Sequence, residues 1–260
     1  MSTSIVPQQS GPPQEQAQKP YIEFLNVHKA FGSNVVLDGV TFNVMPGETV
    51  CILGRSGVGK SVALHQIMGF LKPDKGRILV AGEDITRFSD QQMGEVRKKV
   101  TMVFQNGALF DSLTVGDNVA FPIREHRLMP EADIPARIRE ALAMVGLEGS
   151  EHLMPSELSG GMRKRAALAR ALVLEPRALL YDEPTTGLDP VVAAKINHLV
   201  RDLQQRLGLT SVVVTHDLAS AFYVADRIAF LYEGRIRFVG TTEEARATAD
   251  PPLREFLTAS

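Results

Sequence analysis

One stretch of the sequence has the residue types and spacing that bind phosphate. Residues 54–61 read GRSGVGKS and fit the pattern G-x-x-x-x-G-K-[ST], between an apolar run at 49–53 and a helical pattern. Glycines let the backbone curl so that successive N–H groups point at phosphate oxygens, and the following helix N-terminus adds positive potential. In such a loop Lys60 would contact the β- and γ-phosphates of a nucleotide, and the Ser61 hydroxyl would bind Mg²⁺. The alternative is an ordinary glycine-rich turn.

Polar residues also follow two apolar runs further along the chain. Residues 178–183 read ALLYDE and residues 212–216 read VVVTH, so each predicts a buried strand that ends in polar groups. The carboxyl ends of parallel strands share the sheet edge where α/β proteins place ligands. There Asp182 could hold Mg²⁺ through water, Glu183 could deprotonate an attacking water, and His216 could hydrogen-bond a γ-phosphate. Taken alone, the run at 178–183 is more typical of a helix start or a turn, and an isolated His216 is more typical of a structural histidine. The presence of the phosphate loop favours a hydrolytic site at this sheet edge.

The elements that would position these residues alternate between strand and helix. Residues 21–53 look like strands and turns, and a helix is predicted from 59 to about 70. Residues 90–175 have helical periodicity, notably at 134–145 and 162–174, and are interpreted as a helical lobe inserted into an α/β core. The core then resumes with strands at 178–182, 211–215 and 227–232 and helices at 191–207 and 218–225. This alternation predicts a mostly parallel sheet covered on both faces.

Composition indicates one folded domain with flanking segments. The 260 residues are 44% hydrophobic and 22% charged, which supports a buried core and excludes global disorder. Residues 1–20 are rich in glutamine and proline and are predicted to form a disordered tail. The folded domain is predicted to span 21–245, with a core at 21–89 and 176–245 and the helical lobe at 90–175, followed by a C-terminal tail at 246–260.

Charge and hydropathy exclude several classes of protein. The net charge of −2, from 28 basic and 30 acidic residues, leaves no basic footprint for nucleic acid. No apolar run reaches the roughly 20 residues of a membrane span, and residues 1–20 lack the apolar segment of a secretory signal. Cys51, the single cysteine, excludes an internal disulfide and is predicted to be buried. The chain is therefore expected in the cytosol, held at a membrane only by a partner.

A further motif separates this sequence from other phosphate-loop proteins. Residues 158–162 read LSGGM and precede a helical pattern that begins with Arg163, Lys164 and Arg165. They resemble the signature motif LSGGQ of the ATP-binding cassette (ABC) family, with Met162 in place of glutamine. Other family elements occur in the expected order: an adenine-stacking aromatic residue, the Q-loop, the D-loop and the switch histidine, at Phe31, Gln105, Asp189 and His216. The resemblance covers residues 21 to about 240.

The resemblance implies a P-loop NTPase fold and an ATPase that uses ATP and Mg²⁺. The fold would be α/β, with a mostly parallel sheet, an N-terminal antiparallel β part and an inserted helical lobe. The implied catalytic residues are Glu183, His216 and Lys60, and the implied Mg²⁺ ligands are Ser61, Gln105 and Asp182. The residues implied to bind the nucleotide are Phe31, Gly54, Ser56, Gly57, Gly59, Lys60, Ser61, Val62, Ser159, Gly160, Gly161 and Asp189.

The signature motif also implies a second copy of the chain. Ser159 and the N–H groups of Gly160 and Gly161 open a predicted helix, where anions are favoured. In the family this motif completes the nucleotide site of the opposite subunit, so two chains would sandwich two ATP molecules in the C₂ arrangement common among homodimers. A solvated helix face or an RNA patch is the alternative interpretation of residues 163–165.

A narrower resemblance concerns the residues after the Q-loop. Residues 108–122 (ALFDSLTVGDNVAFP), together with MRKR after the signature glycines and PTTGLDP after Glu183, are similar to ATPases of the Mla/MCE type. Those ATPases power phospholipid or sterol movement between bacterial membranes. The implied partners are membrane permease subunits, an MCE-type lipid-binding protein and a small STAS-like regulator, and the implied location is the cytoplasmic face of the inner membrane. Phe110, Leu113 and Phe121 could form the socket for the permease or pack in the core.

Two other functions stay open at this point. The first is an ABC ATPase for another cargo, such as amino acids or solvents, because the permease and binding protein choose the cargo. The second is a soluble ABC ATPase that acts as a regulator or assembly factor. A P-loop kinase would not explain the motif at 158–162.

Overall fold

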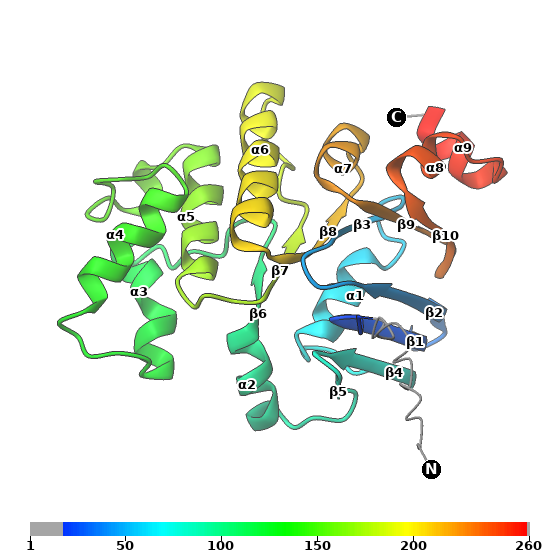
Figure 1. The fold of residues 1–260 in the computed structure, drawn as a ribbon, viewed down its shortest axis with the longest axis horizontal. Coiled ribbons are helices and arrows are strands. Elements are labelled where there is room, and N and C mark those ends of the chain that lie inside the picture. Colours follow the sequence, from blue (N-terminus) through cyan, green and yellow to red (C-terminus); the bar gives the residue numbers. More distant parts are fainter. Residues whose placement is uncertain (1–17, 259–260) are drawn as a thin grey trace, which may run out of the picture.

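The computed structural model describes residues 18–258, and Figure 1 shows the arrangement of their helices and strands. Of the predicted disordered tail at 1–20, residues 1–17 lie outside the described residues. None of the described helices combines the length and the apolar character needed to cross a membrane.

A six-stranded sheet forms the centre of the fold, in the order β10-β9-β3-β8-β7-β6. All neighbouring strands in it are parallel except β10, which runs antiparallel to β9. Its strands are β3 (Thr49–Leu53), β6 (Val100–Val103), β7 (Ala178–Asp182), β8 (Thr210–Thr215), β9 (Arg227–Tyr232) and β10 (Arg235–Thr241). The mostly parallel sheet predicted from the sequence is therefore confirmed.

The second sheet is antiparallel and has the order β2-β1-β4-β5. It consists of β1 (Ile22–Phe31), β2 (Asn34–Val44), β4 (Lys75–Val80) and β5 (Glu83–Asp84). It is the N-terminal antiparallel part that the family resemblance implied.

The helices form groups at different parts of the molecule. They are α1 (Lys60–Ile67), α2 (Asp90–Lys99), α3 (Val115–His126), α4 (Ile134–Met144), α5 (Gly160–Leu172), α6 (Pro190–Leu207), α7 (Leu218–Val224), α8 (Thr242–Arg246) and α9 (Pro251–Thr258), with a short 3₁₀ turn at Pro155–Glu157. In Figure 1, α3, α4 and α5 gather at one end beside α6, whereas α8 and α9 lie at the opposite end.

The parallel strands are buried on both faces because their side chains alternate between two apolar cores. Cys51 and Leu53 of β3 face a core built with α3 to α7, whereas Val50 and Ile52 face a core built with α1, α2 and the antiparallel sheet. This explains why the strands read as continuous apolar runs in the sequence. Cys51 is fully buried, as predicted.

Two expectations need correction. Residues 90–175 are not helical throughout, because Val100–Val103 form β6, which pairs with β7 from Val100 to Val103. A run of four buried residues carries no periodicity that separates it from the preceding helix α2. The segment 246–260, expected as a tail, contains α9, where Leu253 and Phe256 are buried one helical turn apart.

Candidate functional site

The phosphate loop connects the end of β3 to the start of α1, as predicted. Gly57 and Gly59 have φ angles of 80° and 109°, a region that glycine adopts without steric cost. A Cβ at Gly59 would lie 2.7 Å from Cγ1 of Val36, and one at Gly54 would lie 2.4 Å from the carbonyl oxygen of Leu231. Both positions therefore need glycine for the loop to close against its neighbours.

Lys60 is buried at the first turn of α1, with 5% of its surface exposed. Its Nζ donates to the carbonyl oxygens of Gly54 (2.8 Å) and Arg55 (3.1 Å) and lies 3.8 Å from Oε1 of Glu183. Burial lowers the pKa of Lys60, and the carboxylates of Glu183 and Asp182 oppose that shift. The carbonyl oxygens of the phosphate loop thus surround the ammonium group of Lys60, next to the carboxylate that follows β7.

A hydroxyl and a carboxylate meet next to this lysine. Oγ of Ser61 donates to Oδ1 of Asp182 across 2.8 Å, which joins the start of α1 to the end of β7. Oxygen ligands of these two types are those that Mg²⁺ prefers in nucleotide sites, where it also keeps waters and takes phosphate oxygens. The donor set therefore fits Mg²⁺.

The Glu183 carboxylate is held from several sides just after β7. Its Oε1 lies 2.9 Å from Nδ1 of His216, and its Oε2 accepts from the hydroxyls of Thr186 (3.0 Å) and Thr215 (3.3 Å). The residue is only 9% exposed, and its backbone has a φ of 48° in the left-handed region. Side chains from the turn after β7 and from the end of β8 thus fix the direction of one carboxylate.

Lys60, Ser61, Glu183 and His216 line one pocket of about 360 Å³, and Asp182 lies just behind it, bonded to Ser61. The residues that line it are Val36, Ser56, Gly57, Gly59, Lys60, Ser61, Val62, Gln105, Glu183 and His216. The structure therefore brings together most residues predicted for phosphate and water, including Gln105 and His216 from separate loops. The arrangement can hold phosphate groups beside a carboxylate positioned to accept a proton.

Comparison with known proteins decides the family. Residues 37–186 match the family model described as ABC transporter. The chain belongs to the ABC transporter family.

Relatives of the cassette agree with this assignment. This chain is 42% identical over 236 residues to the probable ribonucleotide transport ATP-binding protein mkl of Mycobacterium tuberculosis, covering 91% of this chain and 66% of that protein. The matched part of this chain thus spans about two thirds of the length of mkl. It is 43% identical over 236 residues to the intermembrane phospholipid transport system ATP-binding protein MlaF of Haemophilus influenzae, covering 91% of this chain and 89% of MlaF.

A solved relative also has the same fold. It is a dimer of the ATP-binding cassette MJ0796 in a post-hydrolysis state bound to ADP and Pi. The TM-score is 0.77 and the identity 33%, over 85% of this chain and 98% of that chain. The chain is therefore an ATPase of the ABC type, a nucleotide-binding domain whose relatives form dimers.

Other predicted residues of the cassette do not line the pocket. Ser159 caps α5, where its Oγ accepts from the N–H of Met162 (3.3 Å). Asp189 caps α6, where its Oδ1 accepts from the N–H groups of Val191 (3.1 Å) and Val192 (3.0 Å). Phe31 is 47% exposed at the end of β1.

The signature motif and the D-loop pack against each other within the chain. A Cβ at Gly160 would lie 3.2 Å from Cδ2 of Leu188, and one at Gly161 would lie 2.6 Å from Cγ1 of Val192. Gly161 therefore allows an approach between α5 and α6 that a side chain would prevent.

The sequence interpretation missed several residues of the site. Thr186 and Thr215 donate to Glu183, and Val36 lines the pocket from β2. Lys164 is only 8% exposed, so the interpretation of residues 163–165 as a solvated helix face is wrong at this position. The signal that could have found it is its place among the small apolar residues of α5.

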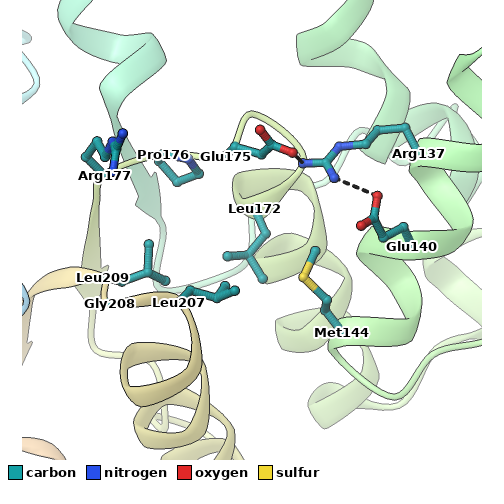
Figure 2. Close-up of a pocket in the computed structure, with 10 residues that line it drawn as sticks. All are labelled: Arg137, Glu140, Met144, Leu172, Glu175, Pro176, Arg177, Leu207, Gly208 and Leu209. Atoms are coloured by element: carbon teal, nitrogen blue, oxygen red, sulfur yellow. Dashed lines mark hydrogen bonds and ion pairs between the residues drawn. The ribbon is translucent and has the colours of Figure 1, made fainter.

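Another pocket, of about 400 Å³, lies between α4, the end of α5 and the end of α6 (Figure 2). The guanidinium of Arg137 forms ion pairs there with Glu140 (2.7 Å) and Glu175 (2.9 Å) and donates to the carbonyl oxygen of Val173 (3.2 Å). Three of its charged side chains are thus paired with one another, and the phosphate loop does not line it. The chemistry therefore belongs to the pocket of Lys60 and Glu183.

Proposed function

We propose that this chain is the ATP-hydrolysing subunit of a transporter that moves phospholipids or related lipids between bacterial membranes. The observation that carries the hydrolytic part is the Glu183 carboxylate, fixed by three side chains at the edge of the phosphate-loop pocket. The lipid cargo is supported by the 43% identity to MlaF over 89% of that protein.

Within the site, the phosphate loop would bind the ATP phosphates. Backbone N–H groups of the loop and Lys60 would hold the β- and γ-phosphates, and Phe31 would stack on the adenine. Ser61, Asp182 and Gln105 would hold Mg²⁺, which would neutralise charge on the β- and γ-phosphates. Lys60 already lies inside the loop, so its ammonium group needs only to exchange carbonyl oxygens for phosphate oxygens.

Glu183 would act as the general base for the attacking water. Thr186 and Thr215 contact the same carboxylate oxygen, so the other oxygen faces His216 and the pocket. A carboxylate with a fixed orientation can align a water molecule and accept its proton. His216, at the same edge, would contact the γ-phosphate.

A second copy of the chain would complete the site. Ser159, Gly160, Gly161 and Asp189 do not line their own chain's pocket, although the family assigns them to nucleotide binding. Facing a second copy head to tail, they would reach the nucleotide held by that copy. The dimeric structure of the MJ0796 cassette supports this arrangement.

The exposed aromatic residues after the Q-loop are the proposed dock for a permease. Phe110 and Phe121 are 43% and 40% exposed, and their ring centroids lie 4.8 Å apart. They line a pocket of about 330 Å³ that Phe70 and Phe104 also line. Exposed aromatic residues around a pocket are typical of an interface. Leu113, partly buried, does not line the pocket.

The remaining partners and the location follow from the lipid assignment. We propose an MCE-type lipid-binding protein and a STAS-like regulator in the same complex, on the cytoplasmic face of the inner membrane. We also propose that α3, α4 and α5, as the helical lobe, carry the closing motion of the dimer to the permease, with the nucleotide core at 21–89 and 176–245 together with β6. A transporter for another cargo is the second candidate, because mkl, named for ribonucleotide transport, is 42% identical.

Co-purification tests the proposal. Tagged Glu183→Gln, expressed in the native host, is extracted from membranes in mild detergent with ATP and Mg²⁺, and its partners are identified by mass spectrometry. We expect a permease and an MCE-type protein, and loss of both when Phe110→Asp and Phe121→Asp are added. Recovery of a permease with a different binding protein would mean that the transporter carries another cargo in place of lipid. Recovery of partners that include no membrane protein would contradict the transporter assignment.

A further inference from the structure

A buried lysine on α5 reaches the backbone of the nucleotide site. Nζ of Lys164 donates to the carbonyl oxygen of Gln105 and to that of Glu183 (3.3 Å). Burial lowers the pKa of Lys164, because its ammonium group is held away from water, while the carboxylates of Glu183 and Asp182 oppose the shift. A lysine is rarely buried without a specific set of partners. Here the partners are the main chains of two proposed site residues.

The same helix holds the rest of the loop that contains Gln105. Arg170 donates to the carbonyl oxygens of Gly107 (2.8 Å) and Ala108 (2.6 Å), which follow each other in the left-handed region with φ angles of 76° and 49°. Between the two cations, a Cβ at Gly107 would lie 3.4 Å from Cβ of Ala167. Positions 164, 167 and 170 lie on one stripe of a helix. Loop 105–108 therefore lies along α5, and hydrogen bonds from Lys164 and Arg170 hold its two ends.

Both main-chain polar groups of Glu183, its N–H and its carbonyl oxygen, form hydrogen bonds. Its N–H donates to the carbonyl oxygen of Val214 (2.9 Å), and its own carbonyl oxygen accepts from Lys164. A non-glycine residue in the left-handed region persists only where its surroundings hold it there. Lys164 supplies one of the contacts that keep this backbone, and hence the carboxylate, in place.

We propose that Lys164 is a positioning residue that couples the start of α5 to the catalytic site of the same chain. The inference rests on the proposed function, in which Ser159 and Gly160 at the start of α5 contact the nucleotide of the opposite copy. A movement that seats α5 on that nucleotide is carried by Lys164 to the backbones of Gln105 and Glu183. Each site therefore becomes competent for hydrolysis when its own chain has engaged the nucleotide of its partner.

The test compares two lysine variants of the full chain. Lys164→Met removes the ammonium group and keeps the side-chain length, whereas Lys195→Met changes an exposed lysine of α6 and is the matched control. We expect kcat for ATP hydrolysis to fall about 10- to 100-fold in Lys164→Met, the range for a misplaced catalytic group. The affinity of the monomer for a fluorescent ATP analogue should stay within about twofold, because the phosphate loop is unchanged. Lys195→Met should match the unmodified chain.

Two further measurements separate coupling from a purely structural role. Lys164→Arg, which keeps a cationic donor, should recover most of the lost turnover. In a Glu183→Gln background, Lys164→Met should raise the ATP concentration needed for dimer formation at least about fivefold, since α5 and the site no longer move together. If Lys164→Met does not fold, Lys164→Gln, which removes the charge and keeps a shorter polar side chain, is measured in its place with the same expectations.

The outcomes distinguish this inference from the proposed function. Unchanged kcat in folded Lys164→Met, or in Lys164→Gln where that variant replaces it, overturns the role of Lys164. A loss of nucleotide affinity that equals the loss of turnover also overturns it. An unmodified chain that binds ATP and never hydrolyses it would contradict the proposed function instead.

Discussion

At the scale of single residues, the chemistry depends on how Glu183 is oriented. Its carboxylate contacts three side chains, and Lys60 lies 3.8 Å from one of its oxygens. The neighbouring acid, Asp182, is instead hydrogen-bonded to Ser61. Two adjacent carboxylates therefore have different partners, one suited to a proton and the other to a metal ion.

Glu183→Gln should lower kcat for ATP hydrolysis at least about 100-fold, in the range for losing a general base, and leave ATP binding intact. The amide keeps the shape of the side chain but cannot accept the water proton. Steady-state phosphate release and equilibrium binding measure the two quantities. Glu148→Gln, the same change at an exposed position, is the control. Hydrolysis by Glu183→Gln at close to the control rate would remove Glu183 from the role of base.

The residues of the pocket and those that hold Glu183 in place differ in how far the sequence predicts them. Lys60 and Glu183 were predicted because a phosphate loop and a strand ending in acids imply a common sheet edge, and both line the pocket. Thr215 and Lys164 were not, since their contacts with Glu183 depend on the turn after β7 and on the rotation of α5. Motif chemistry is local in sequence, whereas these hydrogen bonds join segments that meet only in the fold.

At the scale of elements, length decides what a pattern can predict. β7 and β9 have the predicted bounds, 178–182 and 227–232, because uninterrupted apolar runs of four and five residues, bordered by charged residues, define buried strands. β6 has four residues and directly follows α2, so its apolar run merges with the helical pattern before it. The C-terminal α9 has buried residues only at Leu253 and Phe256, too few to separate an amphipathic helix from a tail.

Phe256→Ala should lower the free energy of unfolding by about 3–5 kcal/mol, the range for truncating a buried phenylalanine. Its ring is 7% exposed and lies 5.4 Å from that of Phe230 on β9, so α9 is part of the core. Urea unfolding of the full chain measures the change. Arg254→Ala, at an exposed position of the same helix, is the control. Equal midpoints for the two variants would show that α9 adds no stability.

At the scale of the whole molecule, the phosphate-loop pocket and the signature motif at the start of α5 lie on different elements. The phosphate loop and the ends of β7 and β8 surround one pocket, whereas Ser159 opens α5 outside it. α5 packs along the Q-loop through Lys164 and Arg170. The helix that begins at Ser159 outside the pocket therefore also contacts the loop of Gln105, which lines the pocket. A second copy, turned head to tail, would bring the start of its α5 to this pocket and receive the same in return.

Dimer formation should therefore require both ATP and the start of α5. With ATP and Mg²⁺, Glu183→Gln should elute at the mass of two chains, because the γ-phosphate links the copies and is not removed. Adding Ser159→Phe should prevent the dimer, since the ring fills the space where the partner's phosphate would sit, yet each monomer should still bind ATP through Lys60. The matched control is Ser89→Phe, which also removes a helix-capping serine, at the start of α2. Size-exclusion chromatography with light scattering measures both masses. If Ser159→Phe dimerised as readily as Ser89→Phe, the start of α5 would not be part of the interface.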